Sequence, residues 1–221
     1  MKLSAFQLKV IAALTMALDH IGAVFFPEIL WIRAIGRISF PIFAFLLSES
    51  CIYTSDFSRY LKRLAVLALV SEIPYNLCFQ NEILSYSSFN IAFTLLLGAS
   101  TIYIYQNWFP KKPFLSCASI TLLILTAQLV NVSYGAFGVI LIFAFFLFRE
   151  RPILSQIAFL LLNLGFSYSP SIMRIQLFGS FAIVPLLLYS GKRGNYSFKY
   201  FFYFFYPLHL LVLWGIHVFL V

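Results

Sequence analysis

The chain has 221 residues, of which 62% are hydrophobic, 19% aromatic and only 10% charged. A water-soluble surface is normally about a quarter charged, so this composition excludes an ordinary soluble domain and predicts an integral membrane protein. The net charge of +8 does not indicate a nucleic-acid partner, because basic residues beside long apolar runs report membrane orientation first. We therefore expect the lipid bilayer, and no nucleic acid, as a partner.

Nine segments are apolar enough to cross a bilayer core, which takes about 20 residues each. In chain order they are 5–26, 31–53, 60–79, 89–105, 114–131, 134–148, 153–166, 171–189 and 200–220. The first is predicted to be an uncleaved span, since Asp19 and His20 interrupt its apolar run and no small-residue cleavage site follows. Turn-forming residues at 131–135 divide the fifth segment from the sixth.

The number of Lys and Arg residues differs strongly between the two sides of the membrane that these spans define. Eleven precede the first span or lie in the even-numbered loops, whereas the odd-numbered loops hold Arg33 and Arg174. Because cytoplasmic loops retain the excess of Lys and Arg, the pattern predicts a cytoplasmic N-terminus. The predicted fold is all-α, a polytopic bundle of about nine transmembrane helices, with residues 1–221 as a single domain. The eleven basic residues are Lys2, Arg59, Lys62, Arg63, Lys111, Lys112, Arg149, Arg151, Lys192, Arg193 and Lys199.

The first span carries the most informative ionisable residues. Burying such a group costs at least about 2.5 to 3.5 kcal/mol on insertion scales, so its retention indicates a partner or a water-filled site. Lys9 and His20 are eleven residues apart and share one helical face, roughly 16 Å apart along the axis. Asp19 points about 100° away from His20. Two interpretations stay open: Asp19 supports a catalytic His20, or it pairs with Arg33 or Arg37 while His20 is a packed polar residue.

Other polar residues in the spans also allow two interpretations. Arg37 and Glu49 are candidates for a structural pair, and Glu72 either accompanies the Pro74 kink or acts chemically. Arg59 and Arg63 lie one helical turn apart at the inner start of the third span, where they either clamp a phosphate or simply mark the cytoplasmic side.

No metal site is expected. A site built from Asp19, His20 and His209 would lack an i, i+4 ligand pair. The cysteines lie in apolar stretches without CxxC spacing, which predicts neither a disulfide framework nor a zinc site. They are Cys51, Cys78 and Cys117.

Several short motifs in one order resemble the TraX family, integral membrane proteins linked to acetylation of conjugative pilin, over essentially the whole chain. They are ALDH at 17–20, IGRISFPIFAF at 35–45, RYLKRL at 59–64, NIAFT at 90–94, LYSGKRG at 188–194 and FYPLH at 205–209. TraX proteins are in turn similar to the acyltransferase 3 group, whose first helix has a basic residue, ten intervening residues and a histidine, and which has an Arg-x-x-x-Arg motif. Lys9 to His20 and Arg59 to Arg63 match these two patterns.

The resemblance implies a membrane acetyltransferase of the bacterial cytoplasmic membrane. In that interpretation His20, Asp19 and Arg37 are catalytic, and cytoplasmic acetyl-CoA is the co-substrate. Lys9, Arg59, Lys62 and Arg63 would hold acetyl-CoA, and Glu49, Asn90, Tyr206 and His209 would support the site or the acceptor. The acceptor would be an amine or hydroxyl of a peptide such as a pilin N-terminus, or of a glycan or lipid. The alternative is a small proton-coupled transporter with Asp19, His20, Glu49, Glu72 and His209 as a relay.

Overall fold

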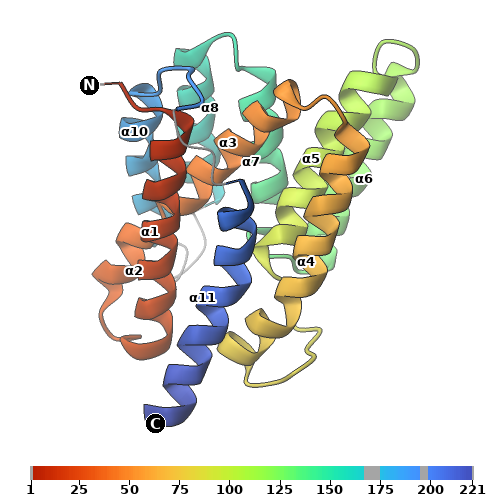
Figure 1. Ribbon diagram of the computed structural model, residues 1–221. Coiled ribbons are helices and arrows are strands. Elements are labelled where there is room, and N and C mark those ends of the chain that lie inside the picture. Colours follow the sequence, from red (N-terminus) through yellow and green to blue (C-terminus); the bar gives the residue numbers. More distant parts are fainter. Residues whose placement is uncertain (1, 167–174, 195–198, 221) are drawn as a thin grey trace.

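The computed structural model describes residues 2–166, 175–194 and 199–220 of the chain, and within these ranges it is all-helical (Figure 1). The helices pack side by side as a bundle, with the N-terminus at one end and the C-terminus at the other. The elements are α1 (Ala5–Phe25), α2 (Leu30–Gly36), α3 (Ser39–Tyr53), α4 (Phe57–Gln80), α5 (Ile91–Trp108), α6 (Pro113–Leu129), α7 (Gly135–Leu147), α8 (Pro152–Phe166), the 3-10 helix η1 (Leu177–Ala182), α10 (Ile183–Leu187) and α11 (Lys199–Leu220).

The start of α1 is fixed by a capping box and by a distant segment of the chain. The Ser4 hydroxyl accepts a hydrogen bond from the Gln7 backbone, and the Gln7 side chain accepts one from the Ser4 N–H at 2.8 Å. Leu3 exchanges backbone hydrogen bonds of 2.7 and 2.8 Å with Leu188 and Ser190. These bonds bring the basic stretch at 192–193 beside the first turns of α1.

The second predicted span, 31–53, is broken, and its prediction as one continuous helix was wrong. α2 ends at Gly36 and α3 begins at Ser39. Pro41 lies in the first turn of α3 and has no N–H to give to the Arg37 carbonyl, so a continuous helix would lack that hydrogen bond. Taken together, Leu30–Tyr53 still has the length and hydropathy of a membrane span. The break places Arg37 at the junction between the two helices.

The order and approximate bounds of the other predicted segments are confirmed where the structure describes them. Within the described part of the chain, three segments have the length and apolar character to cross a membrane: Ala5–Phe25, Leu30–Tyr53 and Tyr203–Leu220. The predicted turn at 131–135 is present, with positive φ angles at Asn131, Tyr134 and Gly135. The predicted span 171–189 lies partly outside the described residues, and its described part forms η1 and α10 rather than one α-helix.

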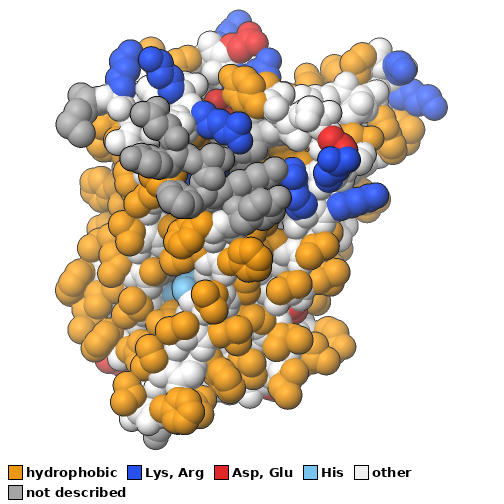
Figure 2. Space-filling model, viewed as in Figure 1, with side chains coloured by type: hydrophobic (Ala, Val, Ile, Leu, Met, Phe, Trp, Pro, Cys, Tyr) orange, Lys and Arg blue, Asp and Glu red, His pale blue; other side chains and the backbone are white. Residues whose placement is uncertain are grey.

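Hydrophobic side chains cover most of the bundle's length on the face seen in Figure 2, and Lys and Arg gather there at the end that carries the N-terminus. Large apolar residues are exposed on the outer faces of the helices, including Leu14 at 61%, Leu69 at 66% and Leu122 at 64%. Water disfavours so much apolar surface, whereas hydrocarbon matches it. The chain is therefore a helical membrane protein, with its basic loops collected on one side.

Candidate active site

A cavity of about 1790 Å³ runs through the bundle between α1, α3, α4 and α11. It is larger than the roughly 300–1,000 Å³ of a typical small-molecule pocket. One wall carries Lys9, Arg59 and Arg63, near the basic end, and a deeper wall carries Asp19 and His20. The predicted basic residues and the predicted imidazole therefore line one continuous space.

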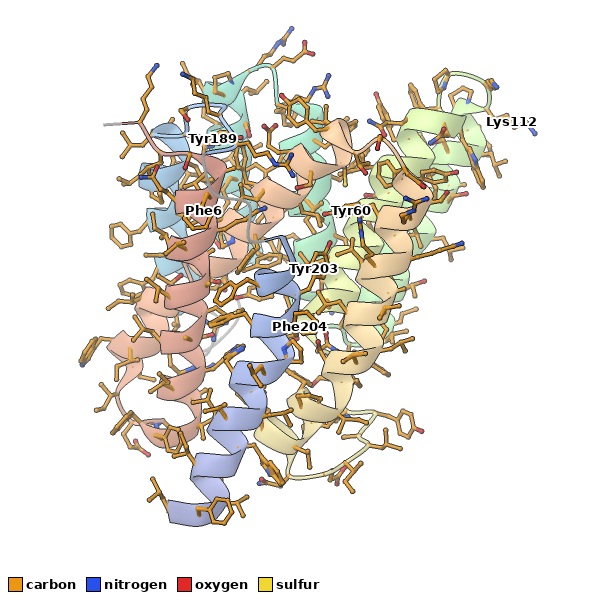
Figure 3. All side chains as sticks on the ribbon, in the orientation of Figure 1. Phe6, Tyr60, Lys112, Tyr189, Tyr203 and Phe204 are labelled. Carbon is orange, nitrogen blue, oxygen red and sulfur yellow. The ribbon has the colours of Figure 1, made fainter. Side chains whose placement is uncertain are left out.

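The basic mouth of the cavity is built from α4 and from the ends of the chain. Arg59 is largely exposed and bridges Asp56, the N-cap of α4, at 3.3 Å. Arg63 follows one turn later, with its guanidinium carbon 5.7 Å from the centre of the Tyr60 ring. Figure 3 shows Tyr60 and Tyr203 close together between α4 and α11. Aromatic rings and cations thus alternate around this mouth.

Arg193 also lines the mouth and acts electrostatically on Lys9. The sequence predicts Arg193 only as a loop charge and not as a site residue. The signal was present, since Arg193 belongs to the LYSGKRG motif and to the inner set of basic residues. By contrast, Lys62 points outward, is exposed and lies outside the cavity wall, so the structure does not place it with the other three predicted donor-binding residues. Lys112 lies at the far tip of the α5–α6 loop (Figure 3).

His20 forms a hydrogen-bonded pair with His209, although the two are 189 positions apart in sequence. Nδ1 of His20 lies 2.7 Å from Nε2 of His209. Nδ1 of His209 lies 2.7 Å from the carbonyl oxygen of Phe205, one turn earlier in α11. The His20 and Phe79 rings pack edge to face with their centroids 5.2 Å apart. The His209 and Phe205 rings stack with their centroids 4.9 Å apart. The pair is enclosed by aromatic rings from α4 and α11.

Asp19 faces α2 and the α2–α3 junction rather than His20. Its Oδ1 lies 3.6 Å from Nε of Arg33 and 3.5 Å from a terminal nitrogen of Arg37. Arg37 also donates to the Tyr134 hydroxyl at 3.4 Å, and Tyr134 in turn stacks on Phe40. Of the two interpretations left open by the sequence, the structure shows the one in which Asp19 pairs with arginine. Tyr134 was missed as a site residue, because the sequence marked it only as part of a turn.

Glu49 and Tyr206 line the cavity at different depths. Glu49 accepts a hydrogen bond of 3.5 Å from the Tyr189 hydroxyl near the basic end, so the considered pairing of Glu49 with Arg37 was wrong. Tyr206 is buried, and its ring centre is 5.8 Å from that of His209.

Asn90 is placed outside the cavity wall, where it joins α4 to α5. Its side-chain nitrogen donates to the Ala68 carbonyl at 2.8 Å and to Glu72 at 2.6 Å. Its side-chain oxygen caps α5 by accepting from the Ala92 N–H at 2.9 Å. Both the nitrogen and the oxygen of the side-chain amide are hydrogen-bonded within the protein. Asn90 therefore links α4 to α5 and does not face the site where the substrate that receives the acetyl group would bind. Glu72 is held in the same link.

Among the described residues, no group of three His, Cys, Asp or Glu side chains has the geometry to hold a metal ion. The cysteines Cys51, Cys78 and Cys117 are all free. What the arrangement offers chemically is an imidazole with one nitrogen fixed by a hydrogen bond, a buried cluster of two guanidiniums and one carboxylate, and a cationic entrance.

Fold and site together define a helical membrane protein with a cavity that extends from its basic end to a buried imidazole pair. The model of the TraX protein family matches residues 4–217, so the chain belongs to the TraX family. It is 27% identical to a probable fimbrial assembly protein FimC, serogroup H1, of Dichelobacter nodosus, over 98% of this chain and 97% of that protein. It is also 28% identical to the uncharacterized protein RP591 of Rickettsia prowazekii (strain Madrid E), over 45% of this chain and 37% of that protein. No solved structure matches the chain.

Proposed function

We propose that the protein is a membrane acetyltransferase that moves an acetyl group from cytoplasmic acetyl-CoA to an acceptor on the other side of the bilayer. The observation that carries this proposal is the single cavity lined by both the cationic mouth and His20. The basic end then faces the cytoplasm of a bacterial cell, as the positive-inside rule requires. The N-terminus lies on that same side.

The donor fits the basic mouth by its charge. Coenzyme A carries phosphate groups at one end and the thioester at the end of a long flexible arm. Arg59, Arg63 and Arg193 offer guanidiniums, which bind phosphate oxygens with paired hydrogen bonds. With the phosphates held there, the arm follows the cavity inward. The thioester then reaches the level of His20, roughly 16 Å along α1 from Lys9.

The chemistry assigned to His20 is general base catalysis. An amine or hydroxyl of the acceptor attacks the acetyl carbonyl carbon, and His20 Nε2 takes the proton that the nucleophile loses. The new bond to carbon forms, the carbon–sulfur bond breaks, and the proton passes from His20 to the departing thiolate. Arg37, which pairs with Asp19 at 3.5 Å, supplies positive charge for the oxyanion that develops on the carbonyl oxygen.

The acceptor is assigned to the opposite end of the cavity, where the lining side chains are polar but uncharged. Its lining carries amide and hydroxyl groups from the last turns of α4 and α6 and from the connections that follow them: Gln80, Ser87, Ser88, Gln128, Asn131 and Ser133. Such groups suit a peptide backbone or sugar hydroxyls better than a phosphate. The relative named for fimbrial assembly, and the link of TraX proteins to pilin acetylation, favour the N-terminus of an exported pilin-like peptide.

Purified protein incubated with acetyl-CoA labelled in the acetyl group tests the proposal. Enzyme activity predicts binding of acetyl-CoA and release of free CoA once a pilin-like peptide is added. A protein that fails to bind acetyl-CoA, but moves protons when reconstituted into vesicles, would instead be the proton-coupled carrier. The carrier explains the buried ionisable residues, whereas it leaves the cationic mouth without a role.

A further inference from the structure

His20 can act as a base in the proposed reaction only if the nitrogen that faces the acceptor carries a lone pair. A neutral imidazole has one protonated and one bare nitrogen, and their identities depend on the hydrogen bonds around the ring. We propose that His209 is the positioning residue that fixes the Nδ1–H tautomer of His20 and leaves Nε2 as the base. This inference rests on the proposed function for its catalytic consequence, and on the His20–His209 contact for its geometry.

The tautomers of both histidines follow from the hydrogen bond between His209 and the backbone carbonyl of Phe205. A backbone carbonyl can only accept, so Nδ1 of His209 must carry the hydrogen in its 2.7 Å contact with the Phe205 oxygen. In neutral His209 the other nitrogen, Nε2, then holds a lone pair. His20 must donate to that lone pair from Nδ1, across 2.7 Å. With both rings neutral, this is the one arrangement that satisfies both contacts.

The ring geometry supports a true hydrogen bond rather than face-to-face stacking. The two ring planes are inclined by only 6°, and their centroids are 5.0 Å apart. A contact of 2.7 Å between ring nitrogens at this centroid separation places both nitrogens nearly on the line between the centroids. The hydrogen and the lone pair lie in the ring planes and therefore point at one another. Phe79 and Phe205 flank the pair and keep water from competing for the bond.

Asp19, the other residue that could orient the His20 ring, pairs with two arginines instead. It is adjacent to His20 in sequence but faces Arg33 and Arg37. Histidine-based sites commonly use a carboxylate to orient the imidazole and to stabilise the imidazolium that forms. Here a neutral imidazole from α11 takes the orienting position. When His20 Nε2 accepts the acceptor's proton, Nε2 of His209 accepts a stronger hydrogen bond from the charged ring and stabilises it.

Two substitutions of His209 separate its two hydrogen bonds. In His209→Gln the side-chain oxygen reaches the place of Nε2 and can still accept from His20. In His209→Asn the shorter amide can still donate to the Phe205 carbonyl but no longer reaches His20. The inference predicts that His209→Asn lowers kcat about tenfold or more, with KM for acetyl-CoA within about twofold of wild type. His209→Gln should recover most of kcat. Equal losses in both variants, or a loss that appears mainly in KM, would overturn the inference.

The tautomer itself can be measured without any activity. The chain has three histidines, so nitrogen-15 spectra of histidine-labelled protein in bilayers contain few signals, which single substitutions assign. His20 should show a protonated Nδ1 and a bare Nε2 in wild type and in His209→Gln, and a mixture of tautomers in His209→Asn. If the wild-type protein showed the expected tautomer but no acetyl transfer, the proposed function would be refuted and the His20–His209 hydrogen bond would stand. A His20 protonated at Nε2 would sink the inference itself.

Discussion

Gly36 of α2 lies directly against Asp19 of α1. A Cβ atom built at position 36 would overlap the Asp19 side chain and come within 2.7 Å of its Cα. The missing side chain thus allows α1 and α2 to approach closely enough for Asp19 to reach both Arg33 and Arg37. The position of Arg37 in the cavity wall therefore depends on the glycine that immediately precedes it in the chain.

Replacing this glycine should disrupt both packing and activity. Gly36→Val forces α2 away from α1, because the new side chain would meet the backbone Cα of Asp19, which cannot move aside. Overpacking of this kind lowers the free energy of unfolding by about 1–3 kcal/mol. We expect a lower thermal unfolding temperature and weaker acetyl transfer. Gly215→Val is the matched control, since nothing lies within 4 Å of a Cβ at that position. Equal behaviour of the two variants would contradict the close approach.

Removal of the proposed base should nearly abolish acetyl transfer without lowering the amount of protein in the membrane. His20→Ala is expected to lower kcat by about 10²–10⁴, the range that a general base contributes. His217→Ala serves as the control, because His217 is in the last turn of α11, against Phe25 and away from the cavity wall. Activity and membrane abundance are compared in the same preparations. Full activity in His20→Ala would remove His20 from the mechanism.

The cationic mouth should act on donor binding rather than on bond making. The double variant Arg59→Ala, Arg63→Ala is expected to raise KM for acetyl-CoA about tenfold or more, with a smaller change in kcat. Lys111→Ala, Lys112→Ala removes the same amount of charge from a loop outside the cavity wall and should leave KM nearly unchanged. A similar KM in both double variants would mean that the mouth contributes only general attraction.

Asn90 should prove structural. Asn90→Ala removes the cap of α5, which alone costs about 0.5–2 kcal/mol, and also frees Glu72 and the Ala68 carbonyl. We expect a lower unfolding temperature, with kcat close to wild type in the protein that remains folded. Asn107→Ala, at an exposed amide near the end of α5, should change neither quantity. If Asn90→Ala lost activity at unchanged stability, Asn90 would belong to the acceptor site after all.

The sequence predicted what depends on local periodicity and charge. Hydrophobic length located the spans, turn residues located the break at 131–135, and helical spacing placed Lys9 and His20 on one helical face, which lines the cavity. It did not predict contacts between helices from opposite ends of the chain, such as His20 with His209. Apolar helix faces pack on each other and on lipid with similar chemistry, so periodicity does not say which helix meets which. The break between α2 and α3 had a local signal in Pro41, but the overall apolar character and length of 31–53 predicted a single span.

The account depends on the acyl end of the donor reaching the His20 region from the basic mouth. Ala23 lies one turn after His20 and lines the cavity, whereas Leu14 of the same helix is 61% exposed on the apolar flank. In protein with Cys51, Cys78 and Cys117 replaced by serine, Ala23→Cys and Leu14→Cys are each treated with a haloacetyl analogue of acetyl-CoA. Covalent labelling of position 23 that excess CoA blocks, with position 14 unlabelled, is the predicted result. Labelling of position 14 alone, or labelling at 23 that CoA does not prevent, would contradict the account.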